Sequence, residues 1–297
     1  MTAASSMRFD TVARDAFAMA RRVMLPTAPA LLLFAVAVGI QSYFNTIANH
    51  GGQLVFLWMT TGLITIFVGC FWSADMYRRI LPEAGTRSVI SDAIRLFLAN
   101  LAIYGLYFVL LFLLTLFFSI FAGVLIGSTG YDPSETLDSS QAVWESIRAL
   151  SSSGGAVVLY LLLLLAAAGL VWLGLRLFLF GVATVAERDL TIFRSWPWTS
   201  KHVSRIALLW VFLQLIPWLV LTLVATGVMY AMGFEAVFSF YTGAAEDAEM
   251  SQSVMRAVAT GLATLVTAPF YWLGHGLAAA LYQRLAPNRV DADTTFG

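Results

Sequence analysis

The sequence predicts an all-α membrane protein, a bundle of six transmembrane helices. Of its 297 residues, 60% are hydrophobic and only 11% are charged, whereas a soluble domain carries about 25% charged residues. Six apolar stretches exceed the roughly 20 residues that a helix needs to cross a bilayer. A spanning segment must satisfy its backbone hydrogen bonds internally, and a helix does this within one segment.

The order of apolar and basic segments predicts three helical hairpins, each preceded by an amphipathic helix on the cytoplasmic membrane surface. Together they form a single membrane domain over 1–297. The predicted amphipathic segments are 1–25, 82–97 and 186–206; the hairpins are 29–80, 98–185 and 207–282; and an external loop at 127–155 and a cytoplasmic tail at 283–297 complete the chain.

The first amphipathic segment, 1–25, has apolar residues at three- and four-residue spacing. Arg14, Arg21 and Arg22 fall largely on the other side, which gives the helix a basic polar face. Pro26 then breaks it, since proline is poorly tolerated inside a helix. We therefore expect the first span to begin a few residues later.

The third amphipathic segment, 186–206, combines positive charges with aromatic residues, a mixture typical of the boundary between water and lipid. Ser195 is a candidate cap for a helix with Pro197 in its first turn. This segment is the predicted contact surface for anionic lipids or a partner. The residues that carry this prediction are Arg188, Arg194, Trp196, Trp198, Lys201 and Arg205.

The distribution of positive charge predicts the topology. Every Lys and Arg except Arg148, Arg176 and Arg256 falls in segments on one side of the predicted spans. By the positive-inside rule, both termini are expected to lie in the cytoplasm. The acidic loop at 127–155 then lies outside.

Several classes of function lack support in the sequence. The formal net charge is zero, so we expect no nucleic-acid partner. His50, His202 and His275 do not match a metal-ligand spacing, and neither a G-x-S-x-G elbow nor a phosphate-binding GxxxxGK[ST] loop occurs. We therefore expect a protein that is not an enzyme and has no metal or cofactor.

Three ionisable residues lie within predicted spans and form a candidate intramembrane polar site: Asp75, Arg176 and His275. A charge inside the bilayer costs about 2.5–3.5 kcal/mol on insertion scales, so each needs a partner or a purpose. One interpretation is a site for an anionic headgroup or a proton relay. The other is that Asp75 pairs with Arg78 or Arg79 on its own helix, while Arg176 extends to the interface or joins two helices.

Prolines and glycines mark further positions. Pro217 and Pro269 are candidate kinks near the middle of the last two spans. Paired broken helices mark binding sites in transporters, although isolated prolines are also common in ordinary membrane helices. Gly276 lies in a face of small residues around His275, and Gly123 begins a GxxxG spacing; both patterns are typical of close helix packing.

The segment SWPWTSKHVSRIALLW before the fifth span resembles a region of one group of bacterial six-helix membrane proteins. The matching positions are Ser195, Trp196, Thr199, Lys201 and Arg205. This group resembles the membrane domain attached to some glycerophosphodiester phosphodiesterases and includes stand-alone relatives of unknown function. The chain has no soluble phosphodiesterase domain, so no catalytic residue carries over. The resemblance implies an inner-membrane protein concerned with envelope lipids.

Two hypotheses of function follow from these patterns. The first is a non-enzymatic scaffold, regulator or lipid-interacting module that contacts anionic lipids of the cytoplasmic leaflet, together with a membrane or cytoplasmic protein partner. The alternative is a small transporter or permease that uses Asp75, Arg176 and His275. The sequence names no substrate for the second.

Overall fold

A computed structural model describes residues 8–48, 52–81, 88–128, 148, 151, 154–231 and 250–286. No strand occurs in these residues, and six helical stretches are long and apolar enough to cross a membrane. They are Ala28–Ile47, Leu54–Ile80, Val89–Ser128, Gly155–Glu187, Val203–Val224 and Ser253–Leu285. The predicted all-α membrane fold is confirmed. Most of the predicted loop at 127–155 and of the tail at 283–297 lies outside the described residues.

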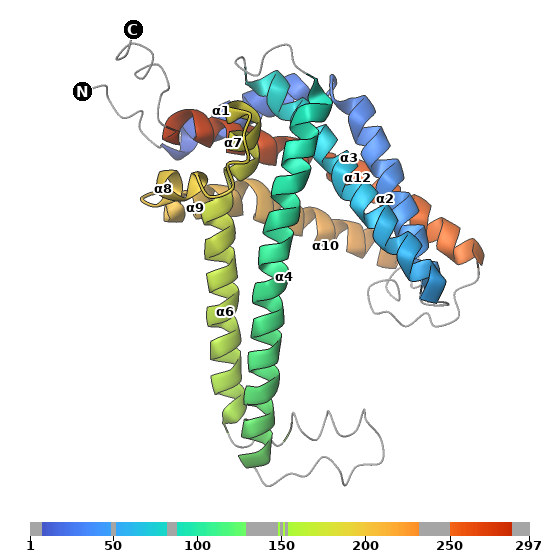
Figure 1. Cartoon of the computed structure of the whole chain (residues 1–297), viewed down its shortest axis with the longest axis vertical. Helices are drawn as coiled ribbons and strands as arrows, with labels where there is room; N and C mark the ends of the chain where they lie inside the picture. Colours follow the sequence, from blue (N-terminus) through green and yellow to red (C-terminus); the bar gives the residue numbers. More distant parts are fainter. Residues whose placement is uncertain are drawn as a thin grey trace. The chain divides into compact units, whose positions relative to one another are not determined.

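The chain divides into two compact units (Figure 1). The large unit comprises Met1–Ala99 and Arg176–Gly297, and the small unit is Asn100–Leu175.

Three long helices form the centre of the large unit: α2 (Ala28–Ala48), α3 (Gly52–Ile80) and α12 (Met250–Leu285). α2 packs against both of the others, and Figure 1 shows the three running together. Glycines bring α2 and α12 close: a Cβ on Gly39 would lie 3.0 Å from the Ala257 carbonyl oxygen, and one on Gly261 would lie 3.1 Å from that of Ala35. Small residues permit this backbone approach between membrane helices.

Helix α1 (Phe9–Val23) packs along α12. Val12, Ala16, Ala20 and Val23 form its buried face, at the four- and three-residue spacing of one side of a helix. Asp15 forms an ion pair with Arg284 near the end of α12. In this structure, the apolar face of the first predicted amphipathic segment therefore contacts the bundle itself.

The second predicted amphipathic segment is not a separate helix. Helix α4 runs without a break from Val89 to Ser128, through the predicted boundary between 97 and 98. The physical reason is local: no proline or glycine occurs between Val89 and Tyr104, so nothing interrupts the helix. Residues 82–87 lie outside the described residues.

The third predicted segment is broken into short pieces. Helix α7 (Phe180–Glu187) ends at Arg188, whose φ of 59° is left-handed, and α8 (Ser195–Thr199) and α9 (Val203–Trp210) follow. Arg194 occupies the N-cap position of α8, and no side chain caps that helix. The prediction that Ser195 caps it is wrong, because the Ser195 hydroxyl donates instead to the carbonyl of Arg176 at 3.1 Å.

The fifth span is continuous but irregular. α9 leads into a π-helical turn, η3 (Val211–Leu215), and then into α10 (Ile216–Ala231). The amide of Ile216 donates to the carbonyl of Val211, five residues back. Pro217 follows and has no N–H to donate, which favours a departure from the regular helix here. Pro269, in contrast, lies inside α12 without interrupting it.

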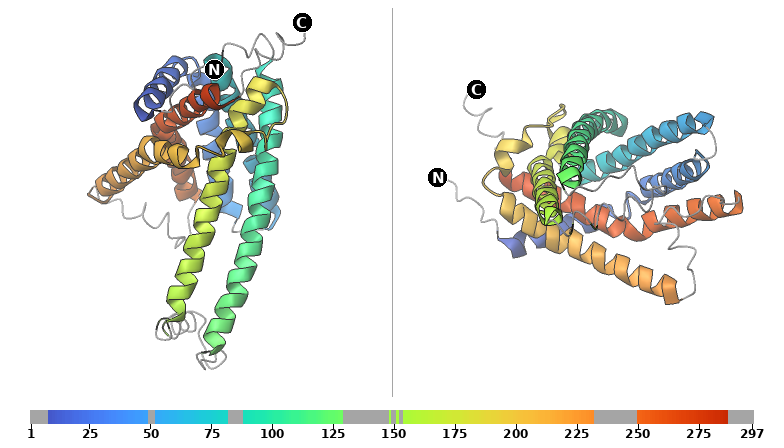
Figure 2. Two further views of the ribbon diagram at one scale, coloured as in Figure 1. Left: turned by 90° about the vertical axis from the view of Figure 1, so that its left-hand side faces the viewer. Right: turned by 90° about the horizontal axis from the view of Figure 1, so that it is seen from below.

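The three-hairpin arrangement stays a prediction. In the described residues, α12 has its main interfaces with α1 and α2 and also contacts η3. Figure 2 shows α10 diverging from α12.

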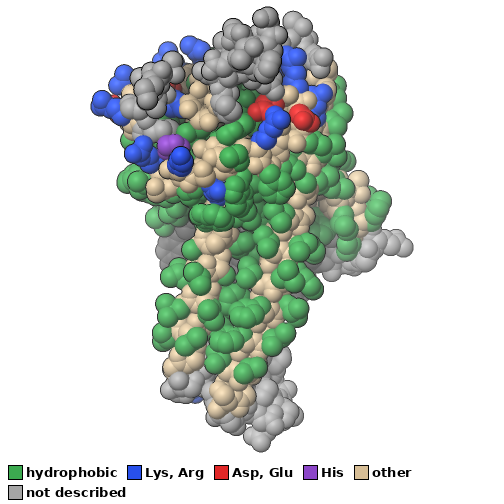
Figure 3. Space-filling view, turned by 60° about the vertical axis from the view of Figure 1, so that its left-hand side comes forward, with side chains coloured by type: hydrophobic (Ala, Val, Ile, Leu, Met, Phe, Trp, Pro, Cys, Tyr) green, Lys and Arg blue, Asp and Glu red, His purple; other side chains and the backbone are tan. Residues whose placement is uncertain are grey.

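The small unit consists of α4 from Asn100 onward and α6 (Gly155–Leu177) as far as Leu175. The two helices meet where the Tyr107 hydroxyl donates to the Leu170 carbonyl at 3.2 Å. Apolar side chains such as Phe108 and Leu165 are exposed along both helices. Figure 3 shows these helices covered with hydrophobic side chains, as a lipid-facing surface requires.

Candidate functional site

The described contacts do not bring the three predicted intramembrane residues together. Asp75 accepts a hydrogen bond from Arg79 at 2.9 Å, one turn along α3. His275 lies on α12 and binds the Tyr271 carbonyl through Nδ1 at 2.7 Å and the Ser73 hydroxyl through Nε2 at 2.9 Å. A carbonyl can only accept, so Nδ1 carries a proton, and in the neutral ring Nε2 accepts from Ser73.

Arg176 has a different environment, at the end of α6. Its guanidinium lies 4.6 Å from the centre of the Trp196 ring, a cation–π distance. Its carbonyl accepts hydrogen bonds from Ser195 and Thr199, both at 3.1 Å. Because both hydroxyls belong to α8, Arg176 fixes that short helix against the end of α6.

Two buried polar junctions in the large unit were not predicted. Thr27, between α1 and α2, accepts hydrogen bonds from the indoles of Trp72 at 3.4 Å and Trp272 at 3.0 Å, and its own hydroxyl donates to Val23. These bonds join the turn between α1 and α2 to α3 and α12. Nothing in the local sequence of a lone threonine indicates such a role.

Asp92 forms the second junction, at the start of α4. It is buried and accepts from Arg78 of α3 at 3.4 Å and from Arg95 at 2.9 Å. The spacing of Asp92 and Arg95 on one helix face was a usable signal for half of this cluster. The contact with Arg78 depends on tertiary packing.

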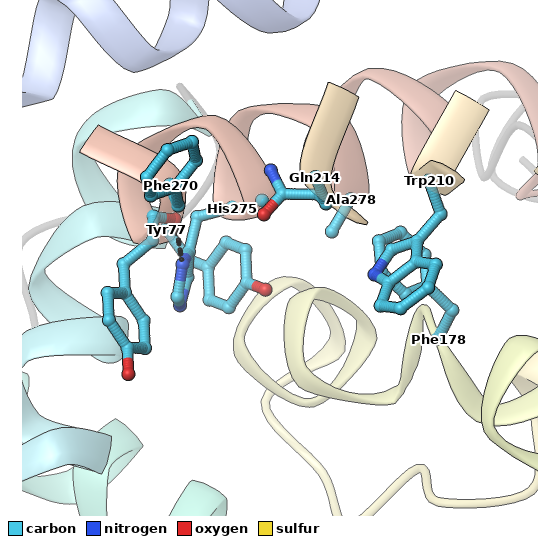
Figure 4. A pocket seen from close by; sticks show the side chains of 9 residues that line it. Tyr77, Phe178, Trp210, Gln214, Phe270, His275 and Ala278 are labelled. Atoms are coloured by element: carbon cyan, nitrogen blue, oxygen red, sulfur yellow. Dashed lines mark hydrogen bonds between the residues drawn. The ribbon is translucent and has the colours of Figure 1, made fainter. Parts of the chain in front are cut away.

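A pocket of about 300 Å³ opens in the large unit, beside the π-helical turn. Most of its walls are aromatic, and none of its described lining residues is a Lys, Arg, Asp or Glu. The lining residues are Tyr77, Phe178, Trp210, Gln214, Phe270, Tyr271, Gly274, His275 and Ala278. In the view of Figure 4, Trp210 and Phe178 lie at one end, Tyr77 and His275 at the other, and the Gln214 amide between them.

Gln214 is the unusual group in this pocket. Its amide nitrogen is buried and has no hydrogen-bond partner in the described part of the chain. Gln214 lies on η3 and faces Gly274. A Cβ added to Gly274 would lie 3.5 Å from the amide nitrogen of Gln214. In the sequence, Gln214 lies among apolar neighbours, and nothing there indicates that it faces Gly274.

A basic surface covers one end of the large unit, where Figure 3 shows Lys and Arg side chains gathered. We call five of its residues the basic edge: Arg14, Arg21 and Arg22 of α1, Lys201 of the turn before α9, and Arg205 of α9. All five are exposed, and none has a carboxylate within ion-pairing distance in the described residues. Helices α1 and α9 pack together, and the Phe9 ring of α1 lies edge-on to Phe212 of the following η3, at 6.0 Å between ring centres.

The other predicted lipid contacts differ from the basic edge. Arg194 forms an ion pair with Glu187, whose hydrogen bond and negative charge raise the pKa of Arg194. Trp198 packs edge-on against Tyr282 of α12, at 5.7 Å between ring centres. Arg188 is exposed at the end of α7. Of the four positive charges predicted in 186–206, Lys201 and Arg205 are therefore the two that belong to the basic edge.

The chain matches no protein-family model, no curated protein and no solved structure. Within the described ranges, no three His, Cys, Asp or Glu side chains gather closely enough to hold a metal ion.

Proposed function

We propose that the protein is a non-enzymatic, lipid-interacting module of a bacterial cytoplasmic membrane, which acts as a scaffold or regulator. In this proposal, the basic edge faces the cytoplasm and binds the headgroups of anionic lipids. The six candidate spans support an integral membrane protein. The sidedness comes from the positive-inside rule applied to the sequence.

The observation that carries the proposal is the pairing of uncompensated charge with exposed apolar residues. Lys201 and Arg205 are exposed, and Leu208, one turn from Arg205, is 54% exposed. On α1, Phe17 is 55% exposed and lies one turn from Arg21. Such a surface places apolar side chains among acyl chains and positive charges among headgroups, the arrangement of interfacial helices.

The segment from Ser195 to Arg205 resembles a region in a group of bacterial six-helix membrane proteins, and that group resembles the membrane domain of some glycerophosphodiester phosphodiesterases. This resemblance also supports lipid binding, because it implies a protein concerned with envelope lipids. The basic edge also suits an acidic membrane or cytoplasmic protein partner. We therefore propose lipid as the first ligand of this surface and a protein as a second partner held at the membrane.

The transporter alternative receives less support from the contacts. Asp75 pairs with Arg79, and the Arg176 guanidinium lies on Trp196, so each ionisable group already has a neighbour that accounts for its position. A solute flux in proteoliposomes that disappears in Arg176→Ala, with folded yield retained, would favour the transporter instead.

The proposal is tested by native mass spectrometry of protein in nanodiscs that hold equal amounts of an anionic phosphatidylglycerol and a zwitterionic phosphatidylcholine. We expect the wild type to retain phosphatidylglycerol preferentially. The double variant Lys201→Gln/Arg205→Gln should weaken the attraction to anionic lipid by about 2 kcal/mol, roughly thirtyfold, since each positive charge near a membrane surface contributes about 1 kcal/mol.

Arg148→Gln is the matched control, because Arg148 is exposed and lies in the predicted external loop. It removes one positive charge by the same type of substitution and should leave the lipid preference unchanged. An equal loss in this control, or an unchanged preference in the double variant, would contradict binding at the basic edge. Thermal unfolding of each variant checks that the fold is retained.

A further inference from the structure

We infer that the pocket beside η3 binds a neutral, membrane-soluble carbonyl compound, and that the Gln214 amide donates a hydrogen bond to the carbonyl oxygen of that ligand. This inference is independent of lipid binding at the basic edge. It depends on the composition of the pocket and on one buried donor.

The lining sets the chemical class of the ligand. Aromatic side chains make up most of the wall: Tyr77, Phe178, Trp210, Phe270 and Tyr271. Among the described residues, none that lines the pocket has a formal charge at neutral pH. An ionic headgroup would lose its hydration here without a counter-charge, which is strongly unfavourable. A flat or apolar body would instead pack against the rings.

The polar groups of the pocket narrow the choice further. Both ring nitrogens of His275 are already engaged, with Ser73 and with the Tyr271 carbonyl. The Gln214 amide nitrogen is buried, lines the pocket, and has no acceptor in the described residues. A buried donor of this kind is destabilising unless something accepts from it, and a carbonyl oxygen is the simplest neutral acceptor.

The backbone explains how the donor reaches this position. η3 widens the helix just before Pro217, and π-helical turns of this kind occur frequently at functional sites. Gly274 on the facing helix has no side chain, so the amide of Gln214 occupies the space beside it. A volume of about 300 Å³ is at the small end for ligand pockets, so a longer molecule must extend out of the opening.

Two membrane compounds share the required chemistry: a quinone, with carbonyls on a flat ring, and a diacylglycerol, with ester carbonyls. The experiment measures binding of decylubiquinone and of dioctanoylglycerol to the full chain in nanodiscs by calorimetry. It compares the wild type with Gln214→Leu, which keeps the side-chain volume and removes the donor. Gln41→Leu, the same substitution on α2, away from the lining residues, is the control.

We expect the wild type to bind one or both probes, and Gln214→Leu to bind about tenfold more weakly, the effect of one lost hydrogen bond. Preference for decylubiquinone would identify a quinone ring as the ligand, and preference for dioctanoylglycerol a lipid ester. Both results support the assignment of the pocket.

Gln214→Leu should weaken binding of the probe but stabilise the ligand-free protein, so a loss of binding can be told apart from a loss of folding. Removing a buried donor that has no acceptor in the described residues should raise the melting temperature of the ligand-free protein, while the stabilisation produced by the bound probe is reduced. Failure of the wild type to bind either probe, or equal affinities for the wild type and Gln214→Leu, would overturn the inference.

Discussion

The two units of the chain differ in how their helices contact one another. In the large unit, helices approach closely and are joined by buried polar groups, as at Thr27, which binds Trp72 and Trp272, and at Asp92. In the small unit, α4 and α6 expose apolar side chains along their length. Its described contacts between helices include the hydrogen bond from Tyr107 to Leu170.

This difference has a physical basis. Between lipid-facing helices there is little hydrophobic driving force, because lipid is as apolar as leucine, so association needs close packing or hydrogen bonds. The large unit has both, and it also holds the pocket and the basic edge. The contrast concerns how the helices are held together, because helices of the large unit also expose apolar side chains, such as Phe56 and Leu223.

The largest expected effect comes from Thr27→Val. This change keeps the side-chain shape and removes the acceptor of two buried indole N–H groups, each of which then lacks a partner. We expect a loss of about 2–3 kcal/mol in stability, measured by denaturant unfolding in detergent. Thr115→Val in the small unit is the control: Thr115 is exposed, so stability should stay within about 0.5 kcal/mol of wild type. Equal losses in both variants would remove the contrast.

A second pair of variants should shift stability in opposite directions. A Cβ on Gly276 would overlap the backbone of Ala16 on α1, and that backbone cannot move aside easily. Gly276→Ala should therefore cost about 1–2 kcal/mol. Gly105→Ala in α4 meets no atom within 4 Å and should stabilise by about 0.5–1 kcal/mol through higher helix propensity. The same unfolding measurement tests both, and a gain in Gly276→Ala would show that α1 does not pack closely on α12.

The long apolar stretches predicted the fold class, whereas the ends of the helices depend on local residues and backbone conformation. Six apolar stretches were sufficient to predict six candidate spans. The helix at 82–97 was predicted as a separate element because its pattern is amphipathic, but no proline or glycine follows Val89 before Gly105, and α4 continues through the predicted boundary. The segment 186–206 was predicted as one helix, and the left-handed backbone of Arg188 could not be read from its residue type.

The candidate site was less predictable, because its contacts depend on which helices meet. Arg176 and Asp75 were predicted as site residues because a charge is rare inside a membrane span. In the structure, Arg176 lies on the Trp196 ring, and Asp75 pairs with Arg79 on its own helix. The pocket depends on neutral residues instead, and only packing reveals that Gln214 and Gly274 face one another. Gly276 was correctly assigned to a close-packed face. In contrast, a Cβ added at Gly123, in the GxxxG spacing, would meet no atom of the described residues within 4 Å. A small-residue pattern therefore needs a facing helix before it means packing.

The smallest expected effect concerns the small unit itself. Tyr107→Phe removes the hydroxyl that donates to the Leu170 carbonyl and changes little else, so the cost should be about 0.5–1 kcal/mol. If the two units are stabilised differently, this change should act locally. Hydrogen exchange should quicken roughly two- to fivefold in α6 near Leu170, while the amides of α2 and α12 keep their wild-type rates. Faster exchange in the large unit as well would mean that the two units unfold together.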